Sequence, residues 1–123
     1  TRMGVTFSEG VSRQNMSLER FVEVTSTNAA KIMGMYPQKG VIAPGSDADI
    51  VLIDPAFDKT LEMSDFHISD YSIWEGFHAQ GWPVTTILRG NVLVEDRELV
   101  NDSKYGRLVK RIVESTVLNR PIC

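Results

Sequence analysis

Between Ser17 and Tyr36, apolar residues recur at the spacing of helices. Residues 1–16 lack such a period and mix glycine with small polar residues, so they are predicted to form a loop in which 7–11 could make one helical turn. Ser17 then offers an N-cap, and apolar residues follow the i, i+3, i+4, i+7 spacing of one helix face. That face comprises Leu18, Phe21, Val22, Ala29, Ile32, Met33 and Tyr36.

The polar run 25–28 interrupts this helical stretch. Its four residues, Thr-Ser-Thr-Asn, prefer helix caps to helix interiors. The sequence therefore predicts two short helices, the second capped by Thr27 or Asn28 and ended by Gly34 and Pro37.

After Gly40 the hydrophobic pattern changes to that of strands. The aliphatic run 50–53 is bounded by turn residues, which predicts a strand buried on both faces and closed by Pro55. Residues 59–63 form a weaker strand candidate. Residues 64–82 combine polar and aromatic side chains without a period and are predicted to form an ordered loop with room for one helical turn.

A hairpin and a last helix complete the predicted elements. Segments 84–88 and 91–95 are rich in β-branched residues and are joined through Arg89-Gly90-Asn91, where glycine or asparagine can adopt the positive φ of a tight turn. Ser103 can cap a helix over 103–116, and 117–123 are expected to form a tail because Pro121 stops the helix. The apolar face of the predicted helix 103–116 comprises Tyr105, Leu108, Val109, Ile112 and Val113.

This order of elements leaves the first helical face without an obvious cover. An amphipathic helix needs an apolar partner surface, so either the strands fold back over it or the partner lies in missing sequence or another chain. The chain opens Thr1-Arg2-Met3-Gly4, without an initiator methionine. We therefore expect a piece of a longer polypeptide.

Composition narrows the class of protein. The chain has 123 residues, a net charge of -3, 42% hydrophobic and 24% charged residues, which is ordinary for a globular domain. No cluster of lysine and arginine favours nucleic acid, the apolar runs are too short to span a bilayer, and no signal peptide pattern is present. Cys123 is the single cysteine, which favours a reducing, cytoplasmic setting.

Histidines and acidic residues do not form a metal-ligand motif. His67 and His78 lie near Asp65 and Asp70 in sequence, but no H-x-H or H-E-x-x-H pair occurs. We predict that both histidines lie in loops or on the surface and bind no metal.

Other candidates for chemistry have simpler explanations. They are the Gly45-Ser46 dipeptide, the acidic pairs Asp47/Asp49 and Glu95/Asp96, the scattered glycines, and the tryptophans Trp74 and Trp82. The dipeptide precedes a strand rather than following one, so it is no nucleophile elbow, and the glycines form no phosphate-binding motif. Carboxylates in turns usually cap backbone amides. The tryptophans indicate either a binding surface or a loop packed on a sheet, and both readings stay open.

Ordered segments of the chain resemble the C-terminal part of dihydropyrimidinases and D-hydantoinases. They are Phe-Ser-Glu-Gly-Val at 7–11 with 18–22, Thr-Ser-Thr-Asn-Ala-Ala-Lys at 25–31 with 36–40, Gly-Ser-Asp-Ala-Asp-Ile-Val at 45–51 with 54–55, then 70–72, 75–76, 81–84 and 89–90. The resemblance covers nearly the whole chain and weakens after about Leu99. Ala29 departs from it, since family members often carry proline there, at a position that looks structural.

The resemblance implies a parent enzyme with a (β/α)8 barrel and a small β-sandwich. In this family two metal ions, usually zinc, activate a hydroxide that opens a cyclic amide such as dihydrouracil or a hydantoin. The family's metal ligands lie upstream of the region that this chain resembles, and Arg2 and Met3 just follow the last substrate-contact segment. No catalytic, cofactor-binding or metal-binding residue is therefore carried over to this chain, and the chain alone is predicted to be inactive.

The same resemblance assigns an α+β fold and three parts. Residues 1–39 correspond to the last helices of the barrel portion, 40–102 to β-sandwich strands and a loop, and 103–123 to a C-terminal helix and tail. The expected partner is the remainder of the barrel, in a homo-oligomer without nucleic acid or membrane. Asp49 is expected to hold the turn amides ahead of the buried strand 50–53. Two alternatives stay open: a non-catalytic assembly module, as in collapsin-response mediator proteins, or a small subunit that completes another polypeptide's barrel.

Overall fold

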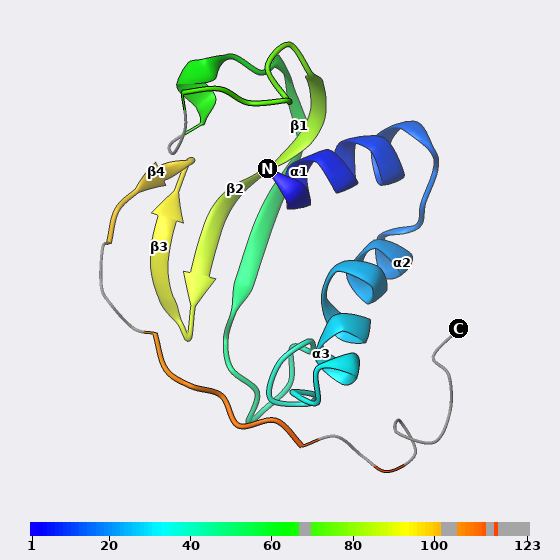
Figure 1. The fold of residues 1–123 in the computed structure, drawn as a ribbon, viewed down its shortest axis with the longest axis vertical. Coiled ribbons are helices and arrows are strands. Elements are labelled where there is room, and N and C mark those ends of the chain that lie inside the picture. The colour runs from blue at the N-terminus through cyan, green and yellow to red at the C-terminus, as the bar shows by residue number, and fades with distance from the viewer. Residues whose placement is uncertain (67–69, 102–105, 113–114, 116–123) are drawn as a thin grey trace.

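The computed structural model describes residues 1–66, 70–101, 106–112 and 115. Helical segments are followed by a four-stranded antiparallel sheet in the order β1-β2-β3-β4 (Figure 1), which confirms the α+β expectation. The helical segments are α1 (Arg2–Thr6), η1 (Phe7–Arg13), α2 (Leu18–Val22), η2 (Glu23–Thr27), α3 (Asn28–Ile32) and η3 (Met63–Asp65). The strands are β1 (Ile50–Thr60), β2 (His78–Leu88), β3 (Asn91–Glu95) and β4 (Glu98–Leu99).

The predicted N-terminal loop is wrong, because α1 and η1 together form a helix. Tertiary packing against β2 stabilises it in spite of its weak local signals. A Cβ on Gly4 would lie 2.3 Å from Cε3 of Trp82, and a Cβ on Gly81 would lie 2.3 Å from Cε1 of Phe7. The two glycines thus allow the helix and the strand to approach each other closely, an interaction that no local pattern reveals.

The predicted cap at Ser17 is confirmed. The backbone amide of Arg20 donates a hydrogen bond to Ser17 Oγ over 3.2 Å, satisfying one of the free amides of the first turn of α2. The helix ends at Ile32, and Gly34 follows with φ 67°, as predicted for the residue after a helix.

The polar run in the middle of this stretch does not break the helix. Residues 23–27 continue as the π-helical segment η2, and Thr27 makes no side-chain capping bond to α3, so the predicted second cap is wrong. The hydroxyls find other acceptors: Thr25 Oγ1 donates to the Phe21 carbonyl (2.6 Å) and Thr27 Oγ1 to the Gly40 carbonyl (2.8 Å). The polar run therefore widens the helix locally and anchors the following loop.

Strand β1 starts where the sequence predicts and runs further. Pro55 does not close it, because the register shifts between Asp54 and Asp58 and β1 is the edge strand, where a proline costs no ladder bond. The weaker strand predicted at 59–63 is also wrong: β1 continues to Thr60, and Met63–Asp65 form η3. Likewise the predicted loop 64–82 ends earlier, since β2 begins at His78.

The predicted hairpin between β2 and β3 is confirmed. Arg89 (φ 46°) and Gly90 (φ 81°) form its two-residue loop, and both carry the positive φ that a type I′ turn requires. A second two-residue turn leads from β3 into the short strand β4, which the sequence pattern does not predict.

The predicted C-terminal helix over 103–116 is wrong for residues 106–112. Residues 106–112 form no helix, and Leu108 and Ile112 of its expected apolar face are 91% and 81% exposed. Among the described residues, these two side chains are not packed into the core, so a short helix there would gain little stability from burial. Ser103 and the predicted tail 117–123, with Cys123, lie outside the described residues.

The buried core of the described residues is small. Its apolar members are Phe7, Phe21, Ala30, Leu61 and Ala79. Phe7 and Phe21 meet edge to face, with ring centroids 5.3 Å apart, so the core joins the two helical stretches. Phe21 is therefore covered, whereas Leu18, Val22 and Ile32 of the same predicted face are half exposed. Within the described residues, no helix is both long and apolar enough to cross a bilayer.

Candidate functional site

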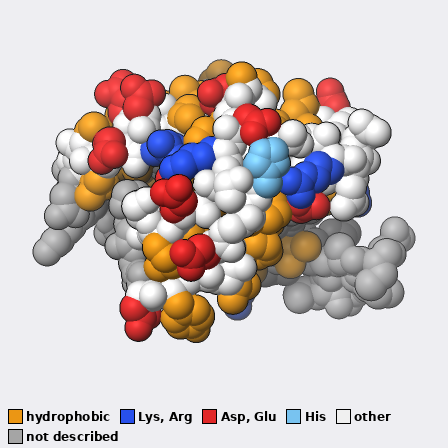
Figure 2. Space-filling model, turned by 90° about the horizontal axis from the view of Figure 1, so that it is seen from above, with side chains coloured by type: hydrophobic (Ala, Val, Ile, Leu, Met, Phe, Trp, Pro, Cys, Tyr) orange, Lys and Arg blue, Asp and Glu red, His pale blue; other side chains and the backbone are white. Residues whose placement is uncertain are grey.

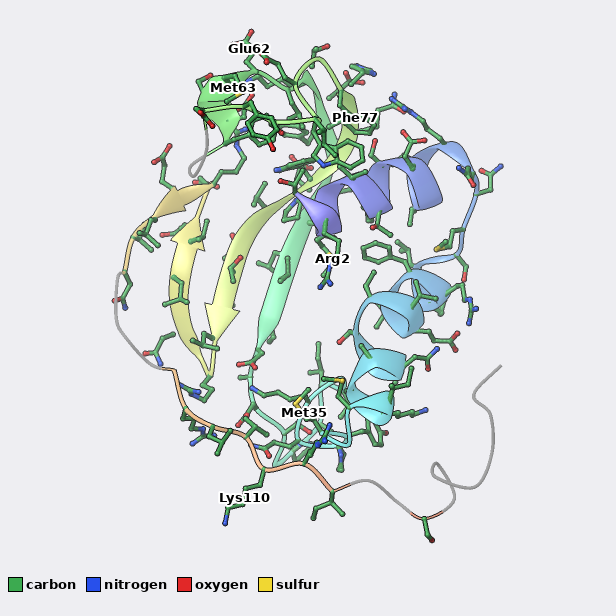
Figure 3. All side chains as sticks on the ribbon, in the orientation of Figure 1. Arg2, Met35, Glu62, Met63, Phe77 and Lys110 are labelled. Atoms are coloured by element: carbon green, nitrogen blue, oxygen red, sulfur yellow. The ribbon has the colours of Figure 1, made fainter. Side chains whose placement is uncertain are left out.

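An apolar groove of about 620 Å³ lies between the helices and β1 in the described structure. Its lining includes Leu18, Phe21 and Val22 from α2, Val41 and Ile42 from the connecting loop, and Val51, Ile53 and Pro55 from β1. Met3 also lines the groove, and Arg2 projects from the first turn of α1 (Figure 3). The lining is largely apolar, and its charged members are Lys39, Asp47 and Asp49.

A charged cluster contributes to the lining of this groove. Lys39 Nζ lies 2.9 Å from Asp47 Oδ2 and also pairs with Asp49 Oδ2. Asp47 further accepts hydrogen bonds from Gln38 Nε2 (3.2 Å) and Arg107 Nη2 (3.1 Å). The cluster thus links the end of the helical region, the loop before β1 and segment 106–112.

The charges in this cluster stabilise one another. Partial burial alone would lower the pKa of Lys39, but the hydrogen bonds and charges of Asp49 and Asp47 outweigh it and raise that pKa above its ordinary value. The hydrogen bond from Lys39 is the main reason that the pKa of Asp47 is lowered. Both groups therefore stay charged around neutral pH, which suits an ion pair and not a general acid or base.

Asp49 holds a turn amide, but in the β2–β3 turn rather than ahead of β1, where the sequence predicts it. The amide of Arg89 donates to Asp49 Oδ1 over 2.9 Å, and the amide of Gly90 donates to the Ala48 carbonyl over 3.0 Å. The loop before β1 is thereby fixed to the β2–β3 turn. This gives Asp49 a structural role in positioning two elements.

A second acidic residue organises the other end of the sheet. Asp65 accepts hydrogen bonds from the Glu62 amide (2.9 Å) and Lys59 Nζ (2.8 Å), and Arg97 Nη1 lies 3.4 Å away. The bond from the Glu62 amide, followed by that from Lys59, lowers the pKa of Asp65. Acidic and basic side chains are intermixed on this end of the molecule (Figure 2), rather than forming a field of one sign.

His78 pairs with an acid that sequence proximity does not suggest. Its Nε2 lies 2.7 Å from Asp58 Oδ1, a contact across the β1–β2 ladder between two exposed side chains. Only the strand register could have indicated this pair. His67 lies outside the described residues. Among the residues that are described, no three His, Cys, Asp or Glu side chains are grouped to hold a metal.

Packing explains the two tryptophans. Trp82 stacks on Phe57 with ring centroids 6.0 Å apart and covers Gly4, while Trp74 meets Phe77 edge to face at 5.6 Å. Figure 3 shows Phe77 above α1, in the loop region that also contains Glu62 and Met63. These contacts favour the packed-loop reading over an exposed binding surface.

Curated proteins with similar sequences include hydantoinases. The chain is 40% identical over 111 residues to the D-hydantoinase of Geobacillus stearothermophilus, spanning 89% of this chain and 24% of the relative. It is 44% identical over 111 residues to the D-phenylhydantoinase of Escherichia coli O1:K1, with the same two shares. The chain thus spans about a quarter (24%) of the length of these relatives.

Solved structures agree with the sequence comparison. The D-hydantoinase from Bacillus sp. AR9 superposes with a TM-score of 0.85 at 41% identity, over 91% of this chain and 25% of that chain. The dihydropyrimidinase from Brevibacillus agri gives a TM-score of 0.83 at 44% identity, over 89% and 24%. A family model described as the amidohydrolase family matches residues 1–93. The chain belongs to the amidohydrolase family, in which it corresponds to a segment of hydantoinases and dihydropyrimidinases.

Proposed function

We propose that the chain is the C-terminal part of a metal-dependent hydrolase that opens cyclic amides, either dihydropyrimidines or hydantoins. The observation that carries the proposal is the superposition of 91% of the chain on a hydantoinase at a TM-score of 0.85 and 41% identity. The chain covers only 25% of that hydantoinase, so the reaction would be performed by the whole parent polypeptide.

The parent enzyme would hold two zinc ions, which supply a nucleophilic hydroxide and polarise the scissile carbonyl. The described residues do not fit such a centre, since no three potential ligands come together among them. Charged groups that could serve as acid or base, such as Lys39 and Asp47, pair with each other instead. These 123 residues would therefore serve as a scaffold. The zinc ligands and the substrate contacts would come from the rest of the parent polypeptide.

The three-part assignment is proposed on the same grounds. Residues 1–39 would end the barrel portion, 40–102 would supply sandwich strands, and 103–123 a C-terminal helix and tail that form in the complete protein. The half-exposed side chains of Leu18, Val22 and Ile32 support this, because a barrel helix needs a partner surface. Exposure of Leu108 and Ile112 likewise suits a segment that becomes ordered against a partner.

The test is made on the purified parent polypeptide that contains residues 1–123. Its zinc content is measured by elemental analysis, and ring opening of hydantoin and dihydrouracil is followed by loss of their ultraviolet absorbance. The proposal predicts about two zinc ions per chain and hydrolysis of at least one substrate class, with removal of zinc by a chelator abolishing it. A metal-free, inactive parent would overturn the proposal in favour of an assembly module. Co-purification of a separate barrel polypeptide would identify a small subunit.

A further inference from the structure

The first half of β2 has a strand on one side only. Its pairing with β1 begins at His78 and continues to Ile87, whereas β3 pairs only with residues 86–88. Within the described part of the chain, the side of β2 away from β1 therefore has no strand beside residues 78–83. Backbone groups left unpaired along such an edge are a template for another strand.

Side chains of η1 bond to the backbone along this edge. The Gln80 amide donates to Ser8 Oγ over 2.9 Å, and Ser12 Oγ donates to the Gln80 carbonyl over 2.7 Å. Arg13 Nη2 donates to the His78 carbonyl over 2.5 Å. In an antiparallel pair every second residue directs both its amide and its carbonyl away from the partner strand. The three bonded groups are thus consecutive along the outer edge of β2, where a neighbouring strand would otherwise bond.

The π-helical winding of η1 explains why one helix reaches all three groups. Ser8, Ser12 and Arg13 are residues i, i+4 and i+5 of this segment. In an α-helix residue i+5 lies about 140° around the axis from residue i and would face away from β2. A π-helix closes its hydrogen bonds between i and i+5, so its wider turn returns residue i+5 to the side of residue i. The widened turn therefore adds Arg13 to the face that already carries the two serines.

The bonding side chains are held in place by their surroundings. Ser8 is completely buried, next to Phe7 of the core. The Arg13 guanidinium pairs with Glu9 and lies 5.3 Å from the centroid of the Phe77 ring. These contacts hold the side chains in one orientation, which reduces the entropy that bonding to β2 costs.

We propose that Ser8, Ser12 and Arg13 of η1 take the place of a strand along the outer edge of β2 at residues 78–80 and prevent any other strand from pairing there. The helix formed by α1 and η1 packs against β2 (Figure 1). A strand from a second copy or from elsewhere in the parent polypeptide would have to displace these side chains, and the buried Ser8 hydroxyl would lose its donor. The proposal goes beyond the proposed hydrolase function and does not depend on it, because it rests on contacts within residues 7–80.

Hydrogen exchange of the parent polypeptide, resolved to single amides, tests the proposal. The double variant Ser12→Ala/Arg13→Met removes two of the three bonds and keeps the buried Ser8. Arg20→Met is the matched control. Arg20 also pairs with a glutamate of its own helical stretch, Glu23, but its bonds in the described structure reach no strand.

We expect the Gln80 amide to exchange about tenfold faster in the double variant than in the unchanged parent, because the loss of two bonds lets η1 open from the edge. The control should exchange as the parent does. Thr86, which lies between β1 and β3, should exchange equally slowly in all three proteins and so shows that the sheet is intact. If Gln80 exchanges at one rate in all three, another strand protects this edge and the proposal is overturned.

Self-association gives a second readout of the closed edge. The double variant leaves the His78 carbonyl and the Gln80 carbonyl open to another strand, so it should form larger species as the protein concentration rises, and the control should not. Light scattering at matched concentrations measures the size of both. A double variant that stays as small as the control would overturn the proposal. An unmodified parent without hydrolase activity would reject the proposed function without altering either readout.

Discussion

The two contacts between helices and sheet differ sharply in how completely they are filled. Where α1 and η1 meet β2, the Gly4–Trp82 and Phe7–Gly81 contacts leave no room for a single additional Cβ atom. Where α2 faces β1, a groove of about 620 Å³ separates half-exposed aliphatic side chains. The chain therefore fills one half of its own interior tightly and leaves a groove in the other half.

Glycine makes the closed half possible. Gly81 has φ 81° and lies under the Phe7 ring, so both its backbone conformation and its lack of a side chain are required. The open half contains ordinary aliphatic residues instead, which are suited to packing against a surface that arrives from elsewhere. Close approach of the backbones thus marks the tightly packed contact, and exposed apolar side chains mark the open one.

The largest expected effect comes from adding a methyl group at the close contact between η1 and β2. Gly81→Ala should lower the free energy of unfolding of the parent by about 3 kcal/mol or more, because it adds a clash with Phe7 to the cost of a positive φ. Gly90→Ala is the matched control: Gly90 has the same φ of 81° and open space around it, so it should cost only about 1–2 kcal/mol. Equal midpoints in chemical denaturation would contradict the close packing.

A smaller loss of stability is expected for substitutions in the groove, and it distinguishes groove residues from residues on the outer surface. Val22 and Val100 are similarly exposed (50% and 54%), but only Val22 lines the groove. If other parts of the parent cover the groove, Val22→Ala should cost about 1.5 kcal/mol, and Val100→Ala should change stability by less than about 0.5 kcal/mol. Denaturation of both variants of the parent measures this, and two equally small changes would indicate that the groove stays open.

Removing the link between the loop before β1 and the β2–β3 turn should have a comparable or smaller cost. Asp49→Ala removes the acceptor of the Arg89 amide and one partner of Lys39, so we expect a loss of about 1 kcal/mol in stability with zinc content and hydrolysis unchanged. Asp49→Asn keeps an acceptor for the amide and should lose less. An unchanged melting temperature in the alanine variant would rule out the structural role.

The acid dependence of stability should reflect Asp47 and Asp65. Both pKa values are lowered in the folded protein from an ordinary 3.8, so their stabilising contribution is complete above that pH and is lost as the pH falls toward the folded values. The combined substitution Asp47→Asn with Asp65→Asn should therefore flatten the loss of stability below about pH 4. Denaturation midpoints between pH 2.5 and 6 measure it, and identical slopes for both proteins would contradict the shifts.

Local signals in the sequence predicted the elements that depend on local chemistry. The Ser17 cap and the Arg89-Gly90 turn follow from hydrogen bonding and backbone conformation within a few residues. The N-terminal helix was missed because its stability comes from Trp82, which lies far along the chain from Gly4. Continuation of β1 past Pro55 was missed because it depends on a register shift at the sheet edge.

The candidate site was predictable to a similar extent. A turn-holding role for Asp49 follows from its place before a strand, but its donor, Arg89, is 40 residues away and could be found only in the fold. The His78–Asp58 pair likewise depends on strand register. The aliphatic residues 50–53 predict a strand that is buried on both faces. In the structure the described residues bury this strand only in part, and the exposed part belongs to the open half.

The most direct test is the size of the native polypeptide that carries this sequence. An immunoblot of source cells with an antibody against residues 40–98 measures the mass of the native polypeptide. The mass shows whether the polypeptide contains further residues that could cover the groove. We predict a band several times heavier than the 13.8 kDa of these 123 residues, in keeping with relatives of which the chain spans 24%. A band at 13.8 kDa would contradict the account and direct the search to a separate partner polypeptide.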